Sequence, residues 1–173
     1  LGGTDEPAVS RTAAPADLLG RRDTWPPVWK DGEKRDPSAA NGSSIMLLAE
    51  YGEHALLLAG DGYAPDLDAA LERLCRERSG QSTAFPVAAF KLPHHASEKN
   101  LTRAVLDKVD CSRYLISTDG SNHGHPDHQA LLRILRYSRQ PPQLLFNYLV
   151  DTTRPWRDSK SDLVDAGFQD YDA

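Results

Sequence analysis

Histidine and aspartate side chains follow three apolar runs of this sequence, at the point where each run ends. The runs are residues 56–59, 87–92 and 113–117. The side chains that follow them are Asp61, His94, His95, Asp119, His123, His125 and His128. Imidazole is the commonest metal ligand in proteins, and a nearby carboxylate adds an oxygen donor. These residues could therefore bind a divalent cation, which would activate water for hydrolysis near neutral pH.

The apolar runs alternate with amphipathic segments, and this alternation predicts an α/β fold. Expected strands cover residues 44–50, 54–60, 87–92, 113–117 and 143–150. Three helices are expected. The first begins at Pro65 and ends at Gly80, the second has Asn100 as its N-cap, and the third begins at Pro126. Strand ends expose chemistry in α/β folds, so we expect the polar side chains to meet there. The first two strands are almost continuously apolar, which predicts that both faces of the sheet are covered.

Four motifs stand in order along the chain. They are Asn-Gly-Ser-Ser-Ile at 41–45, Leu-Leu-Ala-Gly-Asp at 57–61, Lys-Leu-Pro-His-His-Ala-Ser at 91–97 and Gly-His-Pro at 124–126. Together they resemble the C-terminal half of a metallo-β-lactamase-fold hydrolase, an αββα sandwich, and are most similar to the hydrolase domain associated with ComEC/Rec2 competence proteins. In the family an HxHxDH metal-binding loop lies upstream of these motifs, and residues 1–56 of this sequence contain no such pattern. The HxHxDH string that the sequence does contain, at 123–128, includes the Gly-His-Pro motif itself. The chain thus resembles a half-domain whose other half is missing, cleaved or on another polypeptide.

The resemblance implies roles for several residues. Asp61 matches the aspartate that bridges the metal ions, and either His94 or His95 matches the final metal histidine. Adjacent residues of a regular strand point to opposite faces, so we expect one of the two histidines to bind metal and the other to support it. His125 would contact the substrate or protonate the leaving group. Ala96 replaces the glycine usual in this motif. The implied cofactor is one or two divalent ions, zinc or alternatively manganese.

Other polar residues near the motifs are weaker candidates for substrate binding or for support of the metal ligands. Lys91 could position an anion, and Ser97 could orient a histidine or contact a phosphate. Asp119 and His123 belong to the loop that contains His125. His128 lies three residues after His125, one turn into the expected helix, so the two imidazoles could share a face. Each of these residues could equally be a solvated surface residue.

The missing loop defines the expected partners. Asp61 and one histidine would form only a weak half-site, so we expect the isolated chain to be a poor catalyst. A half-domain would also expose a sheet face and strand edges. The expected partner is an N-terminal half-domain or second chain with the HxHxDH loop, or a second copy in a homodimer. The implied substrate is a phosphodiester; the alternatives are a non-catalytic binding or assembly module and a hydrolase of small esters or lactones.

Composition limits the remaining function classes. The 173 residues carry a formal net charge of -5, which argues against nucleic-acid binding through bulk electrostatics. No apolar stretch approaches the roughly 20 residues that span a bilayer. Cys75 and Cys111 are too few for a disulfide scaffold, so we expect two buried free thiols and a cytoplasmic protein.

The sequence divides into three parts. Residues 1–40 are Pro-rich without periodicity and are expected to be a linker or an irregular covering segment, in which Trp25 and Trp29 pack onto the domain. Residues 41–150 are the expected half-domain. Residues 151–173 are a polar tail, which Trp156 and Phe168 could dock onto the domain.

Overall fold

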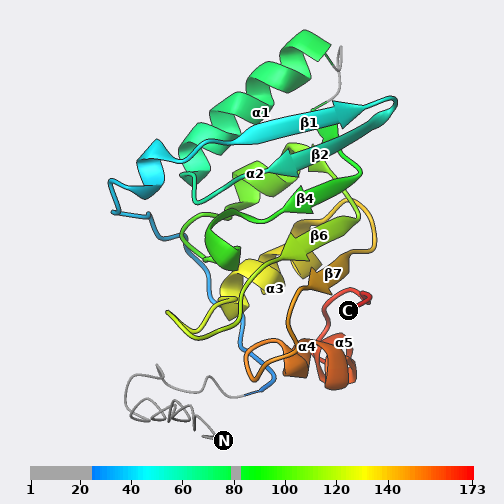
Figure 1. Ribbon diagram of the computed structural model, residues 1–173. Coiled ribbons are helices and arrows are strands. Elements are labelled where there is room, and N and C mark those ends of the chain that lie inside the picture. Colours follow the sequence, from blue (N-terminus) through cyan, green and yellow to red (C-terminus); the bar gives the residue numbers. More distant parts are fainter. Residues whose placement is uncertain (1–24, 79–82) are drawn as a thin grey trace, which may run out of the picture.

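A computed structural model describes residues 25–78 and 83–173 and places them in a mixed α/β fold (Figure 1). The main sheet contains β1 (Leu47–Tyr51), β2 (His54–Leu58), β4 (Ala89–Lys91), β6 (Arg113–Ile116) and β7 (Gln143–Phe146). A small second sheet pairs β3 (Phe85–Pro86) with β5 (Val109–Asp110). The helices are α1 (Ala64–Arg78), α2 (Arg103–Asp107), α3 (His128–Tyr137), α4 (Arg154–Asp158) and α5 (Lys160–Asp165), and two 3-10 turns are η2 (Asn41–Ser43) and η3 (Pro93–Ala96). The expectations for residues 1–24 and for the helix end at Gly80 lie outside the described residues.

The main sheet is mixed, with strand order β1-β2-β4-β6-β7. β1 and β2 form an antiparallel hairpin, and each further neighbour pair is parallel. The carboxyl ends of β2, β4, β6 and β7 therefore lie along one edge of the sheet, as the sequence predicted. The loops that leave this edge contain the candidate residues.

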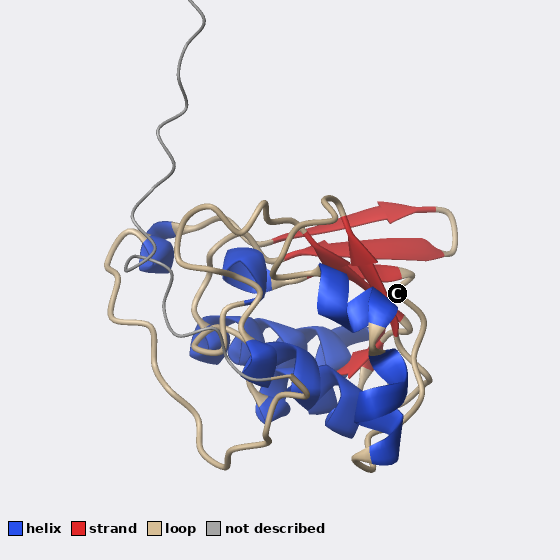
Figure 2. Ribbon diagram, turned by 90° about the horizontal axis from the view of Figure 1, so that it is seen from below, coloured by secondary structure: helices blue, strands red, loops and turns tan. Residues whose placement is uncertain are grey.

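One face of the sheet carries the hydrophobic core. Its central residues, which we call the inner row, align across the sheet as Leu48, Leu57, Phe90, Tyr114 and Leu144. The last four are at most 3% exposed. Figure 2 shows the helices on this side of the sheet. Burial of each large apolar side chain contributes about 2 kcal/mol to stability, so the inner row fixes the packing of the helices.

The opposite face of the sheet is uncovered by the described residues. Its central residues, which we call the outer row, align as Leu47, Leu58, Lys91, Leu115 and Leu145. Leu47 is 52% exposed and Leu145 is 42% exposed. The expectation that both faces are covered is therefore wrong for this part of the chain. The apolar outer row explains why the strands read as apolar on both faces.

Both terminal segments pack onto the domain. Residues 25–40, which we call the strap, begin where the Trp25 ring meets that of Trp156 at 5.3 Å, and the strap then runs past α3. Trp156 is fully buried in the tail, and the Leu144 amide donates to the Asp172 carbonyl, which covers the outer edge of β7. No helix among the described residues is long and apolar enough to cross a membrane.

Two local expectations need correction. The helix expected to begin at Asn100 is α2, and its N-cap is Thr102, whose hydroxyl accepts the Val105 amide at 3.4 Å. Asn100 cannot cap because its buried amide binds groups around the candidate site. The last strand ends at Phe146 because the Asn147 side chain accepts the Thr118 amide at 2.9 Å and holds the chain in the neighbouring loop.

Both cysteines are buried and unpaired, as the sequence predicted. Burial is the main reason why the pKa of Cys111 is raised to about 11, so its thiol stays protonated at neutral pH. Burial also raises the pKa of Cys75. The thiols belong to the core.

Candidate active-site cleft

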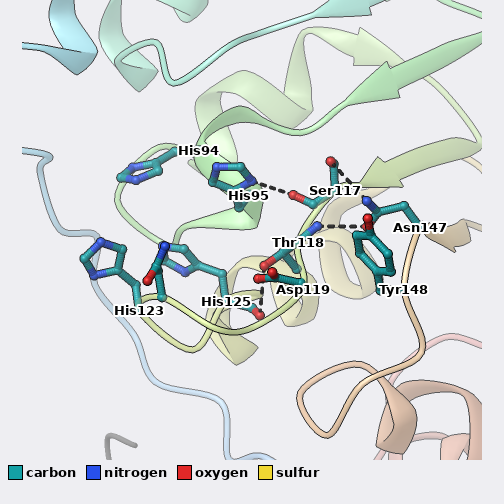
Figure 3. Close-up of a pocket in the computed structure, with 10 residues that line it drawn as sticks. His94, His95, Ser117, Thr118, Asp119, His123, His125, Asn147 and Tyr148 are labelled. Atoms are coloured by element: carbon teal, nitrogen blue, oxygen red, sulfur yellow. Dashed lines mark hydrogen bonds between the residues drawn. The ribbon is translucent and has the colours of Figure 1, made fainter. Parts of the chain in front are cut away.

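A polar cleft of about 510 Å³ opens at the carboxyl ends of β4, β6 and β7. Its lining residues are His94, His95, Ser117, Thr118, Asp119, Asn122, His123, His125, Asn147 and Tyr148. Figure 3 shows the four histidines on one side and the residues that follow β6 and β7 on the other. The structure therefore brings together four of the sequence-predicted histidines and Asp119.

His94 and His95 leave β4 in an unusual backbone conformation. His94, His95 and Ala96 have φ of 43°, 54° and 66°, in the left-handed region that costs a non-glycine residue about 1 kcal/mol. The tight turn directs both imidazoles into the cleft, with ring centroids 6.1 Å apart. The expectation that only one of them could face the site is wrong, because the pair does not continue the strand. Ala96 stands at a position where glycine would be unstrained.

His94 is held from behind by three polar side chains. Its Nδ1 lies 3.2 Å from Asn100 Oδ1, 3.2 Å from Asn41 Nδ2 and 3.4 Å from Asp36 Oδ2. Its backbone amide also donates to the Gly60 carbonyl, at 2.9 Å. This contact ties the loop after β2 to the histidine turn.

Two further imidazoles are held in the same way. The Nδ1 of His95 contacts the Ser117 carbonyl, and the Nδ1 of His125 lies 3.2 Å from Asp127 Oδ1. The ring centroid of His125 lies 5.3 Å from that of His94 and 6.5 Å from that of His95. Each Nδ1 has an acceptor, which leaves Nε2 of all three rings without a partner among the described residues. Imidazoles fixed in this way are suited to bind a ligand or move a proton through Nε2.

Asp61 does not line the cleft. Its backbone carbonyl accepts from Asn100 Nδ2 at 3.3 Å. Its carboxylate acts on Lys91: burial lowers the pKa of Lys91, and the charge of Asp61 partly offsets that effect. The Lys91 ammonium donates to the Leu92 carbonyl at 2.8 Å, and Lys91 also lies outside the cleft lining.

The weaker candidates divide between the cleft and the protein interior. Asp119 lines the cleft, and hydrogen bonds from Ser121 lower its pKa. His123 also lines it, with its ring 6.0 Å from that of His125. Ser97 is 2% exposed and accepts the Lys99 amide, and His128 packs its ring 5.7 Å from Trp156. Neither Ser97 nor His128 reaches the cleft.

Sequence reasoning missed several functional candidates. Asp127 stands two residues after His125, a spacing that could have suggested the pair. Burial opposes ionisation of Asp127, but hydrogen bonds from His125 and from the Glu98 amide give a net lowering of its pKa. Asp36 gave no signal, because its segment has no periodicity and its contact with His94 is long-range. Asn147 and Tyr148 were assigned to a strand that ends before them.

The described residues do not fit a metal ion on their own. Among residues 25–78 and 83–173, no group of three or more histidine, cysteine, aspartate or glutamate side chains is arranged to hold one. Asp61 is not among the residues that line the cleft with the imidazoles.

Comparisons with known proteins do not assign a function to the cleft. No protein-family model matches the chain. No curated protein and no solved structure matches it either. A function therefore has to be argued from the cleft and from the four sequence motifs.

The lowered pKa of Asp36 predicts that the folded protein loses stability in acid. Burial of this carboxylate opposes ionisation, but hydrogen bonds from Asn41, the Ser38 amide and Asn100, with the charge of His94, lower its pKa from 3.8 to about 2. A pKa lower in the folded state stabilises the fold above about pH 4, and this contribution is lost as the pH falls toward 2. We expect Asp36 to account for about 2 kcal/mol of that loss.

Urea unfolding at a series of pH values measures this loss. The free energy of unfolding of Asp36→Asn should fall less steeply between pH 4 and pH 2 than that of the wild type. Asp107→Asn is the control, because Asp107 is exposed and pairs with Arg103. Parallel curves for wild type and Asp36→Asn would contradict the assignment.

Proposed function

We propose that this cleft is one part of a hydrolase active site that acts on phosphodiesters, completed by a polypeptide that carries an HxHxDH loop. The observation that supports the proposal most is the set of three imidazoles, each held at Nδ1 from within the fold and each turned to one cleft at the strand ends. The four motifs that resemble a metallo-β-lactamase-fold hydrolase indicate the reaction class and a metal-binding loop upstream of them. The HxHxDH string at 123–128 does not take the place of that loop, because His128 lies outside the cleft, with its ring 5.7 Å from that of Trp156. Zinc or manganese bound with that loop would supply a Lewis acid and an activated water.

The residues of this chain would orient the substrate and move protons. The Asp127 carboxylate lies 3.2 Å from Nδ1 of His125 and fixes the orientation of that ring. His125 could then donate a proton from Nε2 to the oxygen that leaves phosphorus. Ser117, Thr118 and Asn147 offer hydroxyl and amide groups on the opposite wall of the cleft. These groups would bind the phosphate or the sugar of the substrate.

The uncovered sheet face supports the proposal that a second polypeptide binds this chain. The outer row places four leucines on that face, with Lys91 at its centre. Exposed apolar patches of this kind mark association surfaces. The loop-bearing half is the occupant that would cover the face and complete the cleft, and a second copy of this chain would cover it when the half is absent.

Charges on the outer row should therefore prevent association. We expect the isolated wild type to self-associate as its concentration rises, and the double variant Leu47→Glu, Leu145→Glu to remain monomeric. Both leucines are about half exposed, so the monomer should stay folded. Val164→Glu on α5, 39% exposed, is the control and should associate like the wild type. Sedimentation velocity measures the difference, and a wild type that stays monomeric at all concentrations contradicts the prediction.

The proposed activity is tested on the assembly that the chain forms in its own cells. A tagged chain is purified, its partners are sequenced, and hydrolysis of bis(p-nitrophenyl) phosphate is compared with hydrolysis of a lactone. We expect a partner with an HxHxDH sequence and turnover of the phosphodiester, with no turnover by this chain alone. Preferred turnover of the lactone would instead support an esterase or lactonase.

A non-catalytic binding or assembly module is the second candidate. It is favoured by the absence of a complete metal-binding group among the described residues, together with the exposed apolar face. Such a module would bind its partner through the outer row without any hydrolysis. Turnover that appears only when the two polypeptides are mixed would exclude it.

A further inference from the structure

The strap places the buried carboxylate of Asp36 beside His94, which lines the cleft. The Asp36 side chain is 4% exposed, and its Oδ2 accepts from Asn41 Nδ2 at 2.7 Å and from Asn100 Nδ2 at 2.9 Å. Its Oδ1 accepts the Ser38 amide at 2.9 Å. The same Oδ2 lies 3.4 Å from Nδ1 of His94. Asp36 thus stands behind the imidazole, on the side away from the substrate.

The position of the strap is fixed by its own contacts with the domain. Gln129 on α3 binds the backbone at Val28 and at Lys30. Arg133 donates to the Gly32 carbonyl at 2.9 Å, and Lys34 pairs with Glu98. The strap is therefore anchored to α3 and to the loop before α2 by residues that precede Asp36.

The orientation of Asn100 determines where the His94 proton lies. Asn100 is fully buried, and its Nδ2 donates to Asp36 and to the carbonyls of Asp61 and Gly62, at 2.9, 3.3 and 3.1 Å. Three acceptors on this side fix the amide nitrogen there, so Oδ1 is the atom that faces His94. Nδ1 of His94 then has two acceptors, Asn100 Oδ1 and Asp36 Oδ2, and only a proton on Nδ1 satisfies both. One N–H of Asn41 Nδ2 donates to Asp36 at 2.7 Å, and the same nitrogen lies 3.2 Å from Nδ1 of His94, so Nδ1 faces one donor and two acceptors.

We propose that Asp36 and Asn100 are positioning residues that, in the neutral form of His94, keep the ring proton on Nδ1, so that the lone pair on Nε2 faces the cleft. The inference rests on the proposed function only for the use of that lone pair, as a proton acceptor or a ligand. The strap is then part of the active-site structure and not a passive cover. Chains that lack it should lose the fixed imidazole even where the sheet folds.

The position of the proton can be observed directly by NMR. Imidazole nitrogens in ring-¹⁵N-histidine protein are recorded at a pH where the rings are neutral, and the His94 signals are assigned with His94→Gln. We expect a protonated, pyrrole-type Nδ1 and an unprotonated, pyridine-type Nε2 in the wild type. In Asp36→Asn the ratio of the two tautomers should shift by about tenfold toward protonated Nε2, because the negative charge 3.4 Å from Nδ1 is replaced by a neutral amide. Asp107→Asn is the matched control and should not change the ratio.

Two results would overturn the inference: a wild-type His94 with its proton on Nε2, or an unchanged tautomer ratio in a folded Asp36→Asn variant. The wild-type spectrum needs no variant, so a variant that fails to fold leaves the test intact. The outcome is also separate from the proposed function. A proton on Nδ1 in an assembly that hydrolyses no phosphodiester contradicts the function and keeps the role of Asp36, whereas a proton on Nε2 contradicts that role whatever the activity.

Discussion

Replacement of His125 by alanine should lower the turnover of the completed enzyme by about 100- to 10,000-fold, the usual contribution of a general acid. His125 lies in the cleft, with its ring 5.3 Å from that of His94 and its Nδ1 against Asp127. Alanine removes the proton donor and leaves the neighbouring imidazoles in place. His54→Ala is the control, because His54 is exposed at the far end of β2.

The leaving group of the substrate separates proton donation from a general loss of the site. A p-nitrophenolate leaves without protonation, whereas the sugar alkoxide of a dinucleotide needs a proton. His125→Ala should therefore impair cleavage of a dinucleotide far more than cleavage of bis(p-nitrophenyl) phosphate. Equal losses on the two substrates, measured as kcat, would show that His125 does not protonate the leaving group.

Replacement of Arg133 by methionine should lower the free energy of unfolding by about 3 kcal/mol. The side chain is 2% exposed and donates to the carbonyls of Glu98, Leu101 and Gly32. Methionine fills much of the volume but leaves three carbonyls without their donor, and an unsatisfied buried group costs about 1 to 3 kcal/mol. The effects are not additive because the carbonyls can find water once the strap loosens.

The same helix provides the control for this prediction. Arg136 is exposed, and its guanidinium lies 5.2 Å from the Trp29 ring. Arg136→Met should cost less than about 1 kcal/mol, since an exposed cation–π contact contributes little. Urea unfolding of the two variants measures the difference. Equal costs would mean that Arg133 does not anchor the strap.

The strand ends were the part of the fold that the sequence could predict. Apolar runs before Asp61, His94 and Asp119 marked β2, β4 and β6, because a buried strand needs apolar residues and a polar turn ends it. The helix from residue 64 was equally predictable from the spacing of Leu67, Leu71 and Cys75, which are all buried. These signals come from residues that are close together along the chain, so they can be read from the sequence alone.

The contacts behind the histidines could not be predicted. Asp36 reaches His94 only after the strap has passed α3, and no local pattern contains that path. The left-handed turn at His94 could not be predicted either. Glycine is the residue that usually marks such a backbone conformation, and this turn contains none. Asn100 had the sequence position of a helix cap, and tertiary hydrogen bonds to Asp36 and to the loop after β2 gave it a different role.

We propose that the cleft works only together with a second polypeptide. The most direct measurement mixes this chain with the loop-bearing polypeptide at a constant total concentration and records hydrolysis of bis(p-nitrophenyl) phosphate across the range of ratios. A rate that is highest at equal amounts and absent at both ends is the result that we predict. A mixture that forms a stable complex but hydrolyses nothing, or a rate that simply follows one component alone, would contradict the account.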